Sequence, residues 1–152
     1  MPSRRDQITM SDDELRAFLA AKKVVTCATI GPNGRPHLMP LWYSVDGSEL
    51  RSWTYAKSQK AKNLERDARA TLQVEDGEQY QELRGVMMEC DVEIEREPEV
   101  VAGFGQALFA RFNATGPDVE ATIAGQAPKR IGLTFKPTRV VSWDHRKLGG
   151  TY

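Results

Sequence analysis

The segment from residue 86 to residue 95 constrains the fold most, because apolar and acidic side chains alternate along it. The residues of one face are Val86, Met88, Cys90, Val92 and Ile94. On the other face, every side chain that follows Met87 up to residue 95 is acidic. Successive side chains of a strand point to opposite faces, so this period of two predicts a strand with one face buried and an acidic face in water.

Further β-rich segments are separated by turn signals such as Gly31-Pro-Asn-Gly34, Asp46-Gly47 and Asp76-Gly77. The predicted strands are 24–30, about 36–45, about 49–55, 70–75, 86–95, 130–135 and 140–143, with Pro137 between the last two. Many short antiparallel strands favour a mainly β fold, a small closed or partly closed barrel. Periodicity alone leaves an α+β sandwich as the alternative.

Helices are expected around this sheet. Ser11-Asp-Asp-Glu14 has the form of a capping box and precedes an apolar stripe at helical spacing. Two further helical segments are predicted at 99–112 and at 119–124. We expect one domain over 1–152, with a flexible N-terminus at 1–10 and a C-terminal tail at 144–152.

Composition excludes several classes of partner. The 21 Lys and Arg residues balance the 21 Asp and Glu residues, so we expect no binding to nucleic acid or to membranes. Cys27 and Cys90 lie in strand-like runs and are interpreted as buried, reduced thiols, which is typical of a cytoplasmic protein. The two cysteines do not have the spacing of metal ligands, and the two histidines are too few and too far apart in sequence to complete a metal site, so none is predicted.

Positive charge gathers where the third predicted strand ends and a helix begins. Ser58 is placed to cap that helix. The basic residues around it are Lys57, Lys60, Lys62, Arg66 and Arg69. Because a helix N-terminus attracts anions, this junction predicts a phosphate site, and a solvated basic surface helix is the alternative.

The standard catalytic patterns are missing. The sequence has no glycine-rich dinucleotide fingerprint, no phosphate-binding loop of the Walker type and no nucleophile elbow. Catalytic residues therefore stay unassigned, and an enzyme of this kind would rely on a cofactor. Pro40 implies an edge or an interruption in its strand, where open backbone beside Trp42 and Tyr43 can face a flat ring. The alternative is that Met39, Leu41 and Trp42 are ordinary core.

Three motifs occur in an order that resembles a known superfamily. They are T-I-G-P-N-G-R-P-H at 29–37, P-L-W-Y-S-V-D-G at 40–47 and S-Q-K-A-K-N-L-E-R-D-A-R-A-T-L at 58–72. The chain is similar here to the flavin and deazaflavin oxidoreductases of the pyridoxamine-phosphate oxidase superfamily. Ala68 stands where that family usually has proline. The resemblance implies the FMN-binding split β-barrel, with six to seven antiparallel strands and peripheral helices.

The resemblance also implies where a cofactor would lie. Its phosphate would lie at Ser58, Lys60 and Asn63, with Lys62 nearby. The ribityl chain would follow Trp53, Thr54 and Tyr55, and the tricyclic ring would lie against Met39, Pro40, Leu41 and Trp42.

The branch that uses the deazaflavin coenzyme F-420 looks closest. The lysine-rich junction and the C-terminal S-W-D-H-R-K-L resemble actinobacterial members, and Lys57, Lys62, Arg66 and Arg69 would suit the oligoglutamate tail of F-420. The implied activity is hydride transfer to an unsaturated small-molecule acceptor. The alternatives are an FMN-dependent reductase or oxidase, and a non-catalytic cofactor carrier or haem binder that would use His37 or His145.

The family also implies a homodimer with the cofactor groove at the subunit interface. We expect Trp143 or the C-terminal tail to close over the partner's cofactor site, and a disordered terminus is the alternative.

Overall fold

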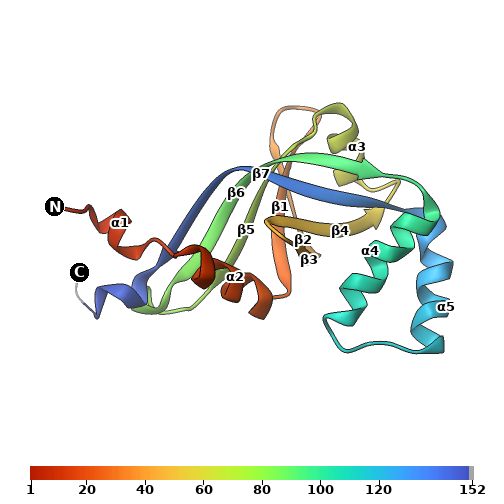
Figure 1. Cartoon of the computed structure of the whole chain (residues 1–152). Coiled ribbons are helices and arrows are strands. Elements are labelled where there is room, and N and C mark those ends of the chain that lie inside the picture. Colours follow the sequence, from red (N-terminus) through yellow and green to blue (C-terminus); the bar gives the residue numbers. More distant parts are fainter. Residues whose placement is uncertain (151–152) are drawn as a thin grey trace.

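The computed structural model describes residues 1–150 as one curled antiparallel sheet with helices around it (Figure 1). The strands are β1 (Val24–Ile30), β2 (Pro36–Trp42), β3 (Ser44–Asp46), β4 (Glu49–Tyr55), β5 (Arg69–Asp76), β6 (Arg84–Glu95) and β7 (Arg130–Asp144). They form a seven-stranded sheet in the order β2-β1-β5-β6-β7-β4-β3. The predicted mainly β split barrel of six to seven strands is thereby confirmed.

Helices lie at both ends of the sheet. The α-helices are α1 (Arg4–Ile8), α2 (Asp12–Ala21), α3 (Gln59–Arg66), α4 (Pro98–Ala110) and α5 (Pro117–Gln126). Short 3-10 helices follow at η1 (Tyr80–Glu82), η2 (Ala127–Lys129) and η3 (His145–Leu148). α2 begins at the predicted capping box, in which Ser11 and Glu14 bond reciprocally through side chain and backbone. Within residues 1–150, no helix is both long and apolar enough to span a bilayer.

A single residue, Tyr43, joins the two edges of the sheet. β2 and β3 lie at opposite ends of the strand order, yet only Tyr43 separates them in sequence. The prediction of one strand over about 36–45 was therefore wrong at this residue. The Tyr43 N–H donates to the carbonyl of Lys23 at 3.3 Å, and its hydroxyl donates to that of Leu19 at 2.7 Å. These bonds turn the chain out of the ladder, and the sheet curls until its edges meet.

Arg111, just after α4, reinforces this junction. Its guanidinium lies 4.6 Å from the centroid of the Tyr43 ring and donates to the Tyr43 carbonyl. It also donates to the carbonyls of Leu19, Ala20 and Lys22 at 3.0, 2.9 and 2.6 Å. Carbonyls at the end of a helix lack intrahelical partners, so Arg111 satisfies those of α2 and fastens α4 to the same point.

The two predicted C-terminal strands, 130–135 and 140–143, are one continuous strand, β7. Pro137 pairs with Cys90 and Arg139 with Glu89, which leaves Thr138 as the extra residue of a β-bulge. The Thr138 hydroxyl donates to the Glu89 carbonyl at 3.1 Å. A proline cannot donate to a ladder, and the bulge accommodates this missing bond without ending the strand.

Two apolar clusters organise the interior. The larger one fills the barrel and includes Leu50, Leu72, Val86 and Phe135. The smaller one packs α4 and α5 against β4, and its buried members are Trp53, Val101, Leu108, Ile123 and Ala127. β4 therefore carries the barrel core on one face and supports the helical hairpin with the other.

We predict that Gly105→Ala destabilises the protein. A Cβ at Gly105 would lie 2.4 Å from the Trp53 ring, so overpacking by about 1–3 kcal/mol should exceed the gain of about 1 kcal/mol in helix propensity. Gly103→Ala in the same helix is the control, because its Cβ would meet nothing within 4 Å and should stabilise. Urea unfolding measures both changes. Equal stabilisation by the two variants would contradict the close packing of α4 on β4.

Candidate functional site

α3 is fixed against the barrel by Asn63, which is fully buried. The Asn63 amide donates to the Thr29 hydroxyl at 3.0 Å and accepts from Gln59 Nε2 at 2.8 Å. Arg66 donates to the carbonyl of Ile30. The Asn63 amide is thus used inside the protein, where it orients the helix, and its contact with a phosphate stays a prediction.

The N-terminus of α3 brings three predicted site residues together. Ser58 caps the helix as predicted, because its hydroxyl accepts from the Ala61 N–H at 3.1 Å. The Thr54 hydroxyl lies 3.4 Å from that of Ser58 and accepts from Lys60 Nζ at 3.0 Å. Lys60 is only 6% exposed, and within residues 1–150 it forms no ion pair. A buried ammonium without a carboxylate partner favours an anion nearby.

Burial lowers the pKa of Lys60, and the nearby Arg130 lowers it further, whereas Cys27 opposes the shift. Burial raises the pKa of Cys27 to about 12, so this thiol stays protonated near neutral pH. The charged form of Lys60 therefore carries a cost in desolvation. An anion bound beside it would offset that cost.

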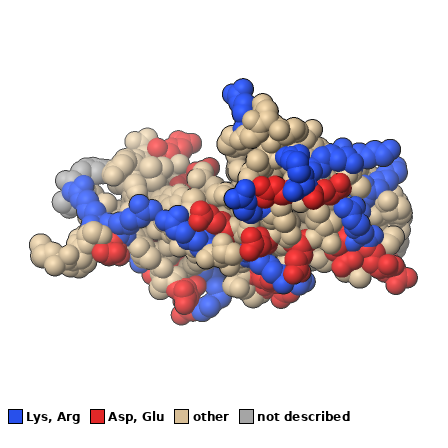
Figure 2. All heavy atoms as spheres, turned by 90° about the horizontal axis from the view of Figure 1, so that it is seen from above, with Lys and Arg blue, Asp and Glu red and all other residues tan. Residues whose placement is uncertain are grey.

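The exposed charges near α3 are arranged differently. Lys57 and Lys62 are exposed, but Arg69 bonds to both carboxylate oxygens of Asp67, at 3.0 and 2.8 Å, and lowers the pKa of Asp67 to about 2. Figure 2 shows basic and acidic side chains interspersed on this side of the molecule. The exposed charges near α3 are thus of both signs. The buried Lys60 therefore indicates an anion site more specifically than the exposed lysines and arginines do.

The predicted ring segment lies on an edge strand. Of the two alternatives expected from Pro40, an edge or an interruption, the structure shows the edge, because β2 ends the strand order and continues through Pro40. Met39 and Trp42 are each 44% exposed, and Leu41 is half-buried against the core. The Trp42 carbonyl accepts a hydrogen bond from the Ser52 hydroxyl at 2.6 Å. This bond ties the end of β2 to β4 across the closure of the barrel.

A cavity of about 330 Å³ lies where β2, β4 and the helical hairpin α4–α5 meet. It is lined by Pro40, Leu41, Trp42, Ser52, Trp53, Leu108, Phe109, Thr122, Gln126 and Arg130. The cavity therefore unites the predicted ring residues 40–42 with Trp53 of the predicted ribityl segment. Tyr55 and the capped start of α3 follow Trp53 directly along the chain, while Met39 does not line the cavity.

Arg130 is a site residue that sequence reasoning missed. It pairs with Tyr55 across β4 and β7, and its guanidinium lies 4.0 Å from the centroid of the Tyr55 ring and 4.6 Å from that of Trp53. Its Nε donates to Gln126 Oε1 at 3.3 Å. The sequence signal was weak, since a basic residue opening a strand is common and nothing local connects it to Trp53.

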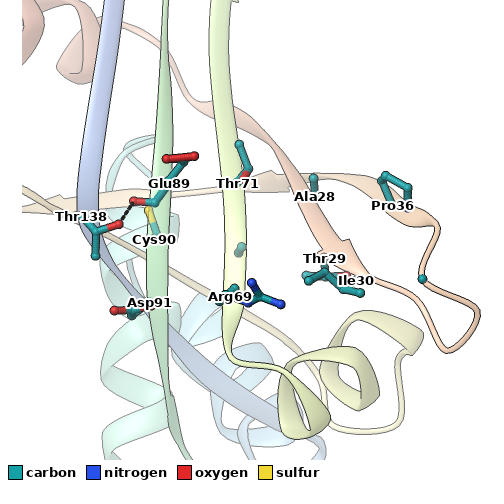
Figure 3. Close-up of a pocket in the computed structure, with 12 residues that line it drawn as sticks. Ala28, Thr29, Ile30, Pro36, Arg69, Thr71, Glu89, Cys90, Asp91 and Thr138 are labelled. Atoms are coloured by element: carbon teal, nitrogen blue, oxygen red, sulfur yellow. Dashed lines mark hydrogen bonds between the residues drawn. The ribbon is translucent and has the colours of Figure 1, made fainter.

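A second hollow, of about 410 Å³, lies over β1, β5 and β6 (Figure 3). Of the residues predicted to contact the cofactor, its lining contains only Arg69, which was expected near the oligoglutamate tail. Arg69, Glu89 and Asp91 give it mixed charge. It touches the candidate site only through Thr29, the partner of Asn63. We therefore place the candidate site at the cavity beside β4 and at the start of α3.

Up to residue 150, the C-terminal segment folds back on its own chain, at the end of the sheet away from α3 (Figure 1). Trp143 packs on Gly85, where a Cβ would lie 2.6 Å from the ring. Lys147 bonds to the Thr9 carbonyl and to Glu14, and the His145 ring lies 2.8 Å from the Tyr80 carbonyl. The last two residues of the predicted tail, 151–152, lie outside the described residues, and closure over a partner's site stays a prediction.

The chain is similar to several proteins of known structure. It shares 39% identity with a conserved hypothetical protein from Mycobacterium tuberculosis, with a TM-score of 0.90 over 99% of this chain and 95% of that one. A structure described as an F-420 reductase has 24% identity and a TM-score of 0.66 over 82% of this chain and 94% of that one. An FAD-binding protein from Mesorhizobium loti has 16% identity and a TM-score of 0.67 over 88% and 94%. The last two show the shared fold alone.

The comparison with curated proteins finds no match. The family model for pyridoxamine 5'-phosphate oxidase, in contrast, matches residues 11–144, which include every strand and the candidate site. The chain belongs to the pyridoxamine 5'-phosphate oxidase family.

Proposed function

We propose that this protein is a reductase that uses coenzyme F-420 and transfers a hydride to an unsaturated small-molecule acceptor. The observation that carries the proposal is Lys60, a buried cation without an ion-pair partner in residues 1–150, held at the capped start of α3. At the end of β4, its ammonium group would bind one phosphate group through a charge-assisted hydrogen bond. The proposal is compatible with the fold that the chain shares with a structure described as an F-420 reductase.

The residues present fit such a cofactor. Lys60 supplies charge to the phosphate, Ser58 and Thr54 supply hydroxyls beside it, and Asn63 holds α3 in place. Trp53 and Tyr55 would flank the ribityl chain, and residues 39–42 would lie against the ring. When bound, reduced F-420 supplies the hydride. The protein orients the acceptor and limits the access of water with its aromatic walls.

The choice of F-420 over FMN depends on charge beyond the phosphate. Lys57 and Lys62 are exposed near the start of α3, and neither forms an ion pair within the described residues. They could meet the oligoglutamate tail, whereas Arg69 is engaged by Asp67. FMN is the second candidate, because the compact group of Ser58, Thr54 and Lys60 also suits a single phosphate.

The homodimer belongs to the same proposal. The edge strand β2 exposes Leu38 (60%), Met39 and Trp42, and Val24 of the adjacent β1 is 49% exposed. An exposed apolar edge strand attracts another chain unless it is covered. A second copy covering β2 would bury this surface and place the cofactor groove at the interface.

We predict that Lys60→Met weakens binding of both F-420 and FMN by about tenfold or more, because the phosphate loses a charge-assisted hydrogen bond. Lys62→Met, an exposed change in the same helix, should weaken F-420 clearly more than FMN. Tryptophan fluorescence titrations measure these affinities, and thermal melting checks the fold.

Wild-type protein should prefer F-420. Tighter binding of FMN would move the protein to the flavin branch, and binding of neither cofactor would refute the proposed function.

The affinity should also depend on pH. Since burial places the pKa of Lys60 below its ordinary value, Lys60 loses its proton at a lower pH than a free lysine does. Cofactor affinity should therefore fall as the pH rises through that lowered pKa, and Lys60→Met should remove this dependence. Titrations at several alkaline pH values measure it. A wild-type affinity that stays constant up to the ordinary lysine range would contradict the role of Lys60.

A further inference from the structure

The lining of the cavity beside β4 contains one charged side chain, Arg130. The Ser52 and Thr122 hydroxyls donate to the carbonyls of Trp42 and Asp118, and the Gln126 amide oxygen accepts from Arg130 Nε. Within residues 1–150, the terminal nitrogens of Arg130 form no hydrogen bond or ion pair. No aspartate or glutamate lines the cavity. Its charge is therefore positive and unneutralised.

Arg130 is also held in a fixed orientation. Its guanidinium contacts the Trp53 and Tyr55 rings, with centroid distances of 4.6 and 4.0 Å, and its Nε is occupied by Gln126. A guanidinium restrained in this way loses little entropy when its remaining N–H groups bind the two oxygens of a carboxylate.

The aromatic side chains of the lining are closely packed. Phe109 meets Trp42 and Trp53 edge-on, with centroids 6.0 and 6.5 Å apart. α4 approaches Trp53 so closely that only glycine fits at position 105. Such aromatic walls favour a flat, apolar ligand.

We propose that this cavity is the acceptor site and that it selects a planar, conjugated carboxylic acid, whose carboxylate is bound by Arg130. The assignment as acceptor site rests on the proposed function, because the residues 40–42 proposed to face the cofactor ring form one wall of the cavity. The selectivity for an acid rests on Arg130 and on the absence of acidic residues from the lining.

The test compares 2-naphthoate with its uncharged analogue 2-naphthamide by isothermal titration calorimetry on the full-length protein without cofactor. We expect the acid to bind more tightly than the amide. Arg130→Gln should weaken the acid by about tenfold or more and leave the amide within about twofold, as expected for loss of a charged hydrogen bond. Arg139→Gln is the matched control, because it removes an exposed arginine from the same strand and should change neither affinity.

Arg130→Lys separates charge from packing. It keeps the charge and should retain part of the preference for the acid, whereas Arg130→Gln should abolish that preference. Equal binding of acid and amide by the wild type, no binding of the acid, or equal weakening of both probes in Arg130→Gln would overturn the proposal.

A second arm repeats the acid titration with saturating F-420. Retained binding supports a separate acceptor site, and mutually exclusive binding would assign the cavity to the cofactor and overturn the proposal. The selectivity of the cavity is thus measured without cofactor, so its failure is distinguishable from a failure of F-420 binding in the Lys60 titrations.

Discussion

The closure of the barrel at Tyr43 is the constraint on which the rest of the structure depends. One residue joins strands at the two ends of the sheet order, so the sheet has to curl through all seven strands. The Tyr43 hydroxyl, its N–H and the contacts of Arg111 hold this point in place. The same closure brings Trp42 to Ser52, and thereby sets the aromatic end of β2 beside β4.

The candidate site follows from that closure and from a second anchor at α3. The hydrogen bond between Asn63 and Thr29 fixes the helix to β1, so Lys60 is held in a buried position beside Thr54. On the other face of β4, Trp53 and Arg130 border the aromatic cavity. A cation is thus available on each side of the same strand end. The two cations suit two different ligands, a cofactor with a phosphate group and an acceptor with a carboxylate group.

Local signals predicted most of the elements but not their connections. The alternation in β6, the turn signals and the Ser58 cap are encoded within a few residues, and the structure bears them out. The break at Tyr43 and the passage of β7 through Pro137 were missed, because each depends on hydrogen bonds from distant segments. Arg130 was missed for the same reason, since its role arises only when β7 pairs with β4. The proximity of Ser58 and Lys60 could be predicted because a helix start and its lysines are adjacent in sequence, and their contact with a phosphate stays a prediction.

The strand order has a consequence for how the protein is made. Within residues 1–150, β4 joins the ladder of the barrel only through β7, which spans Arg130–Asp144. The early strands β1, β2, β5 and β6 can pair with one another while the chain leaves the ribosome. The residues that β4 and β7 contribute to the site can meet only after β7 has emerged. Because pairing of distant segments is slow, a nascent chain would expose Trp42 and Trp53 until β7 has been synthesised and has paired with β4.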